Sequence, residues 1–152
     1  MVKPIPDGYH AITPYLHIQG APAAIEFYKK AFGAAEIMRI TGDDGRIGHA
    51  ELQIGDSRIM LADEHAEIGA FSPQHFGGSP ITLMFYCANV DQVVEQAVAE
   101  GAKITRPITD QFYGDRNGGI VDPFGYQWYI ATHMEDVSNE EMERRAQKFK
   151  VG

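Results

Sequence analysis

The chain has 152 residues, 22% of them charged, with a formal net charge of −8 and a pI near 5.1. This length fits one domain or two small modules that share a core. The acidic balance argues against nucleic acid as a partner, and no apolar run reaches membrane-spanning length. The N-terminal residues lack a secretory pattern and Cys87 is the one cysteine, so we expect a cytoplasmic protein without disulfides.

Two stretches of the chain repeat the same order of elements, about 68 residues apart. The first opens with the strand-like text ITPYLHIQGA from Ile12, and the second opens with ITLMFYCANV from Ile81. Apolar residues at helical spacing follow in both, and each helical run ends at a glycine, Gly33 or Gly101. Three further strand-like segments then complete each repeat. They cover 34–40, 46–55 and 56–63 in the first repeat, and 102–109, 118–123 and 126–133 in the second.

This order predicts a single domain of the α+β class, made of two β-α-β-β-β modules over 8–63 and 81–135. Gly, Ser and Pro are frequent in 64–80, which we expect to be a linker loop. Residues 111–118 are expected to form another loop. The text DPFG at Asp122–Gly125 is interpreted as a turn without chemistry. Ser138-Asn139-Glu140-Glu141 is a capping-box pattern, which predicts a charged helix within 136–152.

Alternation along each strand separates an apolar face from a mixed face. The apolar positions include Leu16, Leu52, Leu61, Leu83 and Ile130, which we expect to pack under the helices. The opposite positions carry Thr, Tyr, Met, His, Gln and Glu. This composition is typical of a cleft wall, where apolar side chains carry a few polar tips. A curved sheet with a half-solvated outer face is the alternative interpretation.

Three stretches of text resemble a known family: AIEFYKKAFGA in the first helix, IMLADE at the end of the first repeat, and YGDRNGGIVDPFGYQWYIATHMEDV in the second. Together with the paired β-α-β-β-β modules, they resemble the vicinal oxygen chelate superfamily. That superfamily contains glyoxalase I, bleomycin- and fosfomycin-resistance proteins and extradiol dioxygenases. Within it, the chain is most similar to the PhnB-like branch.

The resemblance implies an eight-stranded open barrel or cup, usually in a homodimer. It also implies where a divalent metal would bind in metal-dependent members, which use His and Glu on the first and last strand of each module. In this sequence those positions hold Thr13, Met60, Thr82 and Tyr129. Neutral hydroxyl and thioether groups are poor ligands for Zn, Ni, Mn or Fe. We therefore expect no metal and no cofactor at the family's usual site.

The mixed faces and the resemblance together indicate a small organic ligand, held in an aromatic-lined cup and sequestered without a reaction. Phenol rings offer contact area with a polar end, and a guanidinium recognises anions. Packing in a small core, or a surface turn for Arg116, explains these side chains equally simply. The candidate ligand-binding residues are Thr13, Tyr15, His17, Met60, Thr82, Met84, Tyr86, Tyr113, Arg116 and Tyr129.

The sequence leaves open whether the protein is an enzyme. One alternative is a metal-dependent lyase, isomerase or dioxygenase that uses a displaced ligand set, with His17, His49, Glu51 and His133 on the mixed faces of three strands. A second is a metal-free enzyme with Tyr129 or His17 as the acid–base group. A third is a ligand-sensing or purely structural dimer.

Overall fold

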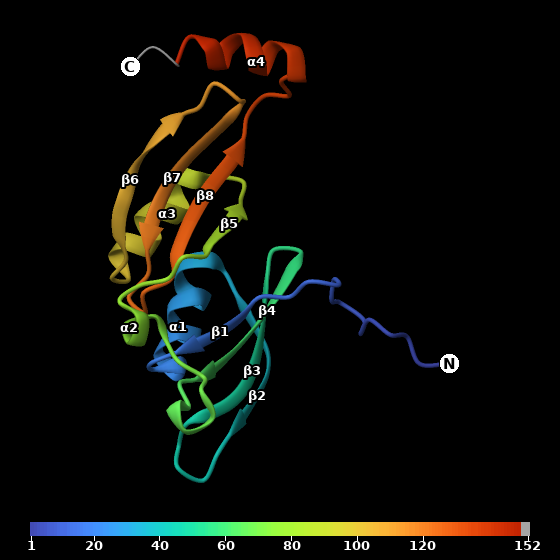
Figure 1. The fold of residues 1–152 in the computed structure, drawn as a ribbon, viewed down its shortest axis with the longest axis vertical. Coiled ribbons are helices and arrows are strands. Elements are labelled where there is room, and N and C mark those ends of the chain that lie inside the picture. The colour runs from blue at the N-terminus through green and yellow to red at the C-terminus, as the bar shows by residue number, and fades with distance from the viewer. Residues whose placement is uncertain (150–152) are drawn as a thin grey trace.

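Each half of the chain folds into one helix and a four-stranded sheet, as the repeat predicts (Figure 1). The structure is a computed structural model that describes residues 1–149. The first module contains β1 (Tyr15–Ile18), α1 (Ala21–Phe32), β2 (Ala35–Thr41), β3 (Ile47–Ile54) and β4 (Ser57–Asp63). The second contains β5 (Thr82–Tyr86), α3 (Val90–Ala99), β6 (Lys103–Asp110), β7 (Asp115–Val121) and β8 (Gln127–His133).

The two sheets have the same topology. Their strand orders are β1-β4-β3-β2 and β5-β8-β7-β6. The first strand of each module pairs in parallel with the last, and the other neighbours are antiparallel. The predicted α+β class with two β-α-β-β-β modules is therefore confirmed. No hydrogen-bonded ladder joins one sheet to the other among residues 1–149, so a single chain forms two open sheets rather than a closed barrel.

The helices form where the sequence places an apolar face and a terminating glycine. Ile25, Tyr28 and Phe32 of α1 are all buried, and they share one side of the helix. Gly33 ends the helix in the left-handed conformation, with φ of 70°, and its N–H bonds back to the Lys29 carbonyl. In α3 the buried residues Val90, Val94 and Ala97 repeat this arrangement.

The two modules meet through their helices. Helix α1 contacts α3, and α3 follows α1 along the long axis of the molecule, which is vertical in Figure 1. The aromatic ring of Phe32 continues this contact into the second module, with its centroid 4.7 Å from Trp128 and 5.3 Å from Phe85. One hydrophobic core therefore spans both modules. The helix-free face of each sheet is left uncovered by the other module.

The structure corrects two of the predicted loops. Strand β7 begins at Asp115, although 111–118 reads as a loop because Asp, Asn and Gly are uncommon in strands. The tertiary pairing of β7 with β6 and β8 overrides that propensity. The linker over 64–80 also contains two short helices, η1 (Ala66–Ile68) and α2 (Pro73–Phe76).

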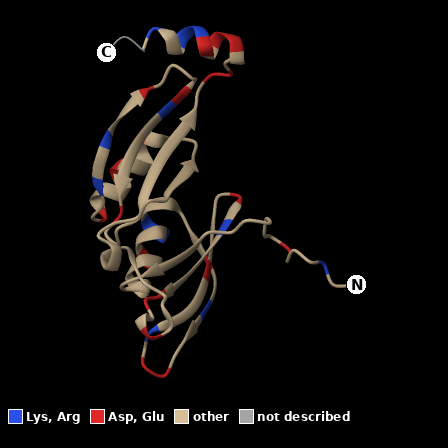
Figure 2. Cartoon of the chain, viewed as in Figure 1, with Lys and Arg blue, Asp and Glu red and all other residues tan. Residues whose placement is uncertain are grey.

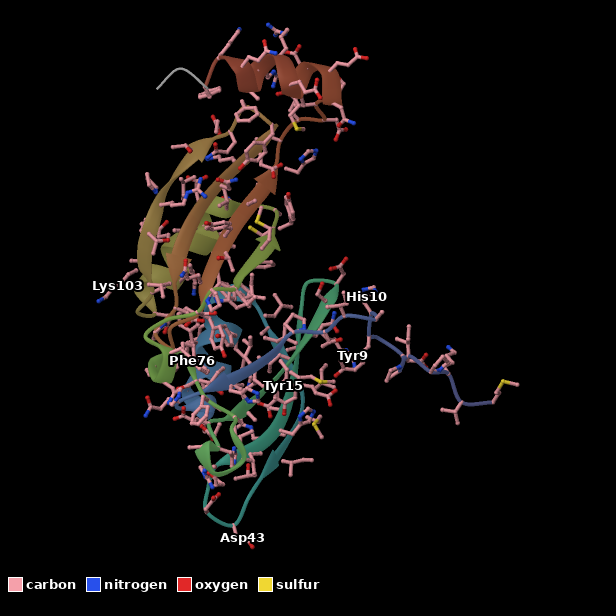
Figure 3. The ribbon with its side chains drawn as sticks, in the orientation of Figure 1. Tyr9, His10, Tyr15, Asp43, Phe76 and Lys103 are labelled. Atoms are coloured by element: carbon pink, nitrogen blue, oxygen red, sulfur yellow. The ribbon has the colours of Figure 1, made fainter. Side chains whose placement is uncertain are left out.

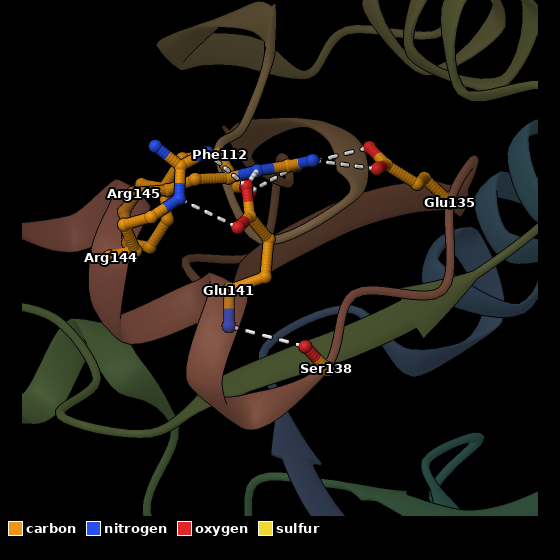
Figure 4. Close-up of polar contacts among 6 residues, drawn as sticks. All are labelled: Phe112, Glu135, Ser138, Glu141, Arg144 and Arg145. Atoms are coloured by element: carbon orange, nitrogen blue, oxygen red, sulfur yellow. Dashed lines mark hydrogen bonds and ion pairs between the residues drawn. The ribbon is translucent and has the colours of Figure 1, made fainter.

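The C-terminal helix α4 (Asn139–Gln147) caps the end of the second module, at the top of Figure 1. The Ser138 hydroxyl accepts a hydrogen bond from the Glu141 N–H, as the capping box predicts. Arg145 fixes the helix to the body of the protein, because its guanidinium donates to the Phe112 carbonyl and pairs with Glu135 and Glu141 (Figure 4). Part of the predicted helix lies in 150–152, outside the described residues.

Charged residues are distributed over both modules and along α4 (Figure 2). None of the helices in residues 1–149 is long and apolar enough to cross a membrane.

Candidate functional site

The face of the first sheet that no helix covers carries the polar and aromatic residues that strand alternation predicts to lie opposite the apolar face. Tyr15 and His17 of β1 lie beside Met60 and Ala62 of β4, and Glu51 of β3 pairs with Met60 across the next ladder. Tyr15 is 41% exposed although it is aromatic. No helix of this module covers these side chains, because α1 packs on the opposite, apolar face. This surface is called face 1 below.

A polar network extends over face 1. The Tyr15 hydroxyl lies 2.8 Å from His49 Nδ1, and His49 Nε2 lies 2.9 Å from Glu51 Oε2. The second oxygen of Glu51 accepts a hydrogen bond from the Tyr9 hydroxyl. The Arg58 guanidinium stacks over the Tyr9 ring at 4.9 Å, which holds the N-terminal segment against the sheet. Tyr9 and Tyr15 are labelled in Figure 3.

The helix-free face of the second sheet, face 2, brings together four of the predicted ligand-binding residues. Met84 of β5 pairs with Tyr129 of β8. Thr82 and Tyr86 lie two residues before and two residues after Met84, so all three side chains point to the same face of the sheet. Met84 and Tyr86 are 44% and 56% exposed. The Arg106 guanidinium lies 5.0 Å from the centre of the Tyr129 ring. Face 2 therefore combines apolar contact area with the positive charge of Arg106.

At one end of face 2, a buried carboxylate organises two of its neighbours. Asp115, 5% exposed, accepts a hydrogen bond from the Tyr86 hydroxyl at 2.8 Å. Its other oxygen lies 2.7 Å from His133 Nδ1, and Asp136 lies 2.7 Å from Nε2 of the same ring. Hydrogen bonds to Asp115 and Asp136 raise the pKa of His133 above its ordinary value of 6.5.

We expect this pKa shift to be visible in solution as a pH-dependent contribution to stability. The folded-state pKa of His133 lies above the unfolded one, so the contribution is complete below about pH 6.5. It is lost as the pH rises through the folded-state pKa. Nuclear magnetic resonance titration of the His133 ring measures this value directly. Asp115→Asn should lower it, and an unchanged pKa in that variant would contradict the assignment.

Two cavities lie at the junction of the modules. The larger, about 530 Å³, is lined by the β3–β4 hairpin of the first module and by β5 of the second, and it includes Thr13, Met84 and Tyr86. The smaller, about 350 Å³, lies beside Tyr15 and Tyr126 and is bordered by the linker. The structure thus brings Thr13 towards face 2, and it places Tyr15 at the edge of a second hollow.

Arg116 lies apart from the other predicted residues of the second module. Its position on β7 puts it opposite Thr132, on the side of the sheet that faces α3, because β7 begins three residues earlier than expected. There it pairs with Asp91 at 2.8 Å and Asp110 at 3.1 Å. The structure therefore does not bring Arg116 to face 2. Tyr113 lies in the turn before β7, where its hydroxyl accepts a hydrogen bond from Asn117 of face 2.

The displaced metal set is not assembled in one chain. His49 and Glu51 are neighbours, but His133 belongs to the other sheet and is bonded to two aspartates. Across residues 1–149, no group of three or more His, Cys, Asp or Glu side chains is arranged so that it could hold a metal ion. At the family's usual positions the hydroxyl and thioether groups are poor ligands for a divalent metal, and the Arg106 guanidinium lies 5.0 Å from the centre of the Tyr129 ring.

Sequence reasoning missed Tyr9 and Arg106 as members of these faces. Tyr9 precedes the first predicted strand, and only the folded chain shows that it reaches Glu51. Arg106 lies in the predicted strand 102–109. A register shift interrupts the β6–β7 ladder at Arg106, so the alternation of residues along this strand does not show that Arg106 lies beside Tyr129. Asp115 and Asn117 were missed because the predicted loop over 111–118 gave no indication of the face on which they lie.

Comparisons with known proteins agree on the architecture. A sequence model of the Glyoxalase/Bleomycin resistance protein/Dioxygenase superfamily matches residues 15–130. An uncharacterised protein of Mycobacterium tuberculosis is 35% identical over 136 residues, which cover 88% of this chain and 80% of that protein. The X-ray structure of an Arabidopsis thaliana gene product superposes with a TM-score of 0.65 at 26% identity, covering 81% of this chain and 98% of that one.

A more distant similarity shows the same fold. The fosfomycin resistance protein FosX of Listeria monocytogenes superposes with a TM-score of 0.64 at 15% identity, covering 88% of this chain and 97% of FosX. The fold is therefore shared well beyond the range of close sequence similarity.

Proposed function

Because the chain belongs to the Glyoxalase/Bleomycin resistance protein/Dioxygenase superfamily, we propose that it binds a small, flat organic molecule against the helix-free faces of its sheets. The observation that carries this proposal is the exposure of large apolar side chains there. Tyr15, Met84 and Tyr86 are between 41% and 56% exposed, next to cavities of about 350 and 530 Å³. Such surfaces are usually covered by a ligand or a partner.

The chemistry of face 2 favours an aromatic ligand that carries an acidic group. Tyr129 and Met84 offer flat, adaptable contact area, and Arg106 supplies the positive charge. The positive charge of Arg106 is opposite in sign to the net charge of −8, so the local charge of face 2 differs from that of the whole molecule. Burial and stacking would supply the affinity, which is a sequestering mode of action.

We further propose that two copies of the chain form the working unit. β1 and β5 are edge strands with no paired neighbour on their outer sides among residues 1–149. Ile12 and Ile81, which precede these strands, are 90% and 62% exposed. Pairing of two chains would cover this apolar edge and would place face 1 of one copy opposite face 2 of the other. Sedimentation velocity should then give twice the 16.8 kDa mass of the chain.

Ligand binding is tested with anilinonaphthalene sulfonate, a flat aromatic anion whose fluorescence rises when it is bound. We expect a saturable site in the wild-type protein and at least tenfold weaker binding, about 1.4 kcal/mol, in Tyr129→Ala. Val98→Ala is the matched control, because Val98 is a 40% exposed apolar residue on α3, away from face 2. Equal binding by the two variants would contradict the proposal.

A further inference from the structure

Three ionisable or polar side chains on face 1 stand in a row from the surface inwards. Tyr15 is the outermost, at 41% exposed. The side chains of His49 and Glu51 are 26% and 18% exposed. The two hydrogen bonds that connect them, of 2.8 and 2.9 Å, use both nitrogens of the imidazole ring. The row therefore has one end open to a ligand and the other end anchored in the sheet.

The pattern of partners fixes the direction of these hydrogen bonds. A carboxylate can only accept, and Glu51 also accepts from the Tyr9 hydroxyl. A neutral His49 therefore carries its proton on Nε2 and donates it to Glu51, which leaves Nδ1 as an acceptor. The Tyr15 hydroxyl then donates to Nδ1, and the lone pairs of its oxygen remain free on the ligand side. This is the arrangement in which a base and an orienting carboxylate stand behind a hydroxyl group.

The surroundings of Tyr15 favour its neutral form and leave a hydrogen-bonding group beside it without a partner in the described part of the chain. Partial burial raises the pKa of the Tyr15 phenol above its ordinary value. The ring of His17 lies 5.2 Å from the ring of Tyr15 and is tilted by 40° to it. His17 Nδ1 is also the one buried side-chain nitrogen or oxygen among residues 1–149 that has no hydrogen-bond partner. The cluster thus has hydrogen-bonding capacity that the fold itself does not use.

We propose that Tyr15, His49 and Glu51 form a proton relay, and that Tyr15 is the group that exchanges a proton with a ligand bound on face 1. The Tyr15 oxygen takes a proton from an ionisable O–H group of the ligand, while the phenolic proton passes to His49 Nδ1. The products are an anionic ligand and an imidazolium ion beside the Glu51 carboxylate. The reverse transfer returns the proton, so no oxidant, reductant or metal is required. His49 and Glu51 act through Tyr15 and are positioning residues.

This inference goes beyond the proposed function, because sequestration requires no proton transfer. It is tested on the protein without any ligand, so its failure is distinct from a failure of ligand binding. The probe is benzenesulfonyl fluoride. In its reaction with a tyrosine, an S–O bond forms, the S–F bond breaks, fluoride leaves, and a neighbouring base takes the phenolic proton. Peptide mass spectrometry measures the labelling rate at each tyrosine.

Tyr86 is the internal control. It is more exposed than Tyr15, at 56%, and its hydroxyl donates to the Asp115 carboxylate instead of to an imidazole. Accessibility alone therefore favours Tyr86. A relay should instead make Tyr15 react at least about tenfold faster, given the usual contribution of a positioned general base. A Tyr15 rate equal to or below the Tyr86 rate would overturn the proposal.

Two substitutions test the roles behind Tyr15. His49→Gln keeps a side chain that can hydrogen-bond but removes the base, so labelling of Tyr15 should fall about tenfold while labelling of Tyr86 stays unchanged. Glu51→Gln should give a smaller fall at Tyr15. A Tyr15 rate unaffected by His49→Gln would overturn the relay. If either variant loses its fold, the Tyr86 rate changes as well, and the comparison of Tyr15 with Tyr86 in the wild-type protein then decides.

Discussion

Replacing Asp122 by alanine is expected to lower the free energy of unfolding by about 3–5 kcal/mol, the largest effect of any single polar substitution that we propose. Asp122 is 4% exposed. One carboxylate oxygen accepts from the Tyr28 hydroxyl at 2.6 Å and from Trp128 Nε1 at 2.9 Å. The other accepts from the backbone N–H groups of Phe124 and Tyr126. Alanine would leave these buried donors without their acceptor.

The position of Asp122 explains why the loss should spread beyond the turn. Tyr28 belongs to α1 of the first module, whereas Trp128 belongs to β8 of the second, so one carboxylate connects the two. Burial raises the pKa of Asp122 above its ordinary value, and the four hydrogen bonds offset part of that shift. The sequence interpretation of DPFG as a turn was therefore incomplete, because the first residue of the turn also joins the modules.

Urea unfolding, followed by circular dichroism, measures the effect. Tyr28→Phe removes one of the four donors and should cost about 1 kcal/mol. Asp43→Ala is the matched control, because Asp43 is an exposed carboxylate at the tip of the β2–β3 hairpin (Figure 3). Its effect should stay within about 0.5 kcal/mol. Similar losses for Asp122→Ala and Asp43→Ala would show that the buried carboxylate does not join the modules.

Gly114→Ala is expected to destabilise the protein by about 3–5 kcal/mol, through backbone strain and overpacking together. Gly114 has a φ of +100°, a conformation that residues with a side chain rarely adopt. An added Cβ would also overlap the Glu135 carbonyl and would lie 3.1 Å from Val137 Cγ2. The Gly114 carbonyl accepts hydrogen bonds from the Met134 and Glu135 N–H groups. The segment around Gly114 therefore cannot move away from Glu135 without losing these hydrogen bonds.

The matched control is Gly45→Ala. Gly45 also has a positive φ, of +83°, but an added Cβ would meet no atom within 4 Å. Its substitution should cost only the strain, about 1–2 kcal/mol. The difference between the two variants in urea unfolding isolates the overlap at Glu135. Because Glu135 holds Arg145 of α4, Gly114→Ala should also release that helix, which limited proteolysis would detect. Equal losses at Gly114 and Gly45 would contradict this account.

The sequence alone predicted the elements that local pattern controls. Apolar residues at helical spacing followed by Gly33 predicted α1, and alternation in 126–133 predicted β8 with Trp128 and Ile130 on the buried side. These predictions succeed because the spacing of apolar residues that lie close together in the sequence determines which face of a helix or strand is buried. The prediction failed at β7, where Asp115, Arg116 and Asn117 have weak strand propensity and only pairing with β6 and β8 makes them a strand.

The composition of the two faces was likewise present in the sequence, since alternation placed Tyr15, Met84 and Tyr129 on the mixed sides. What each residue contacts was decided by the tertiary structure. Arg116 faces α3 because it lies on strand β7, where it pairs with Asp91, and Tyr9 reaches Glu51 across 42 positions of sequence. Tyr28 reaches Asp122 across 94. Such contacts depend on how segments far apart in the sequence pack together, and no local periodicity records that packing.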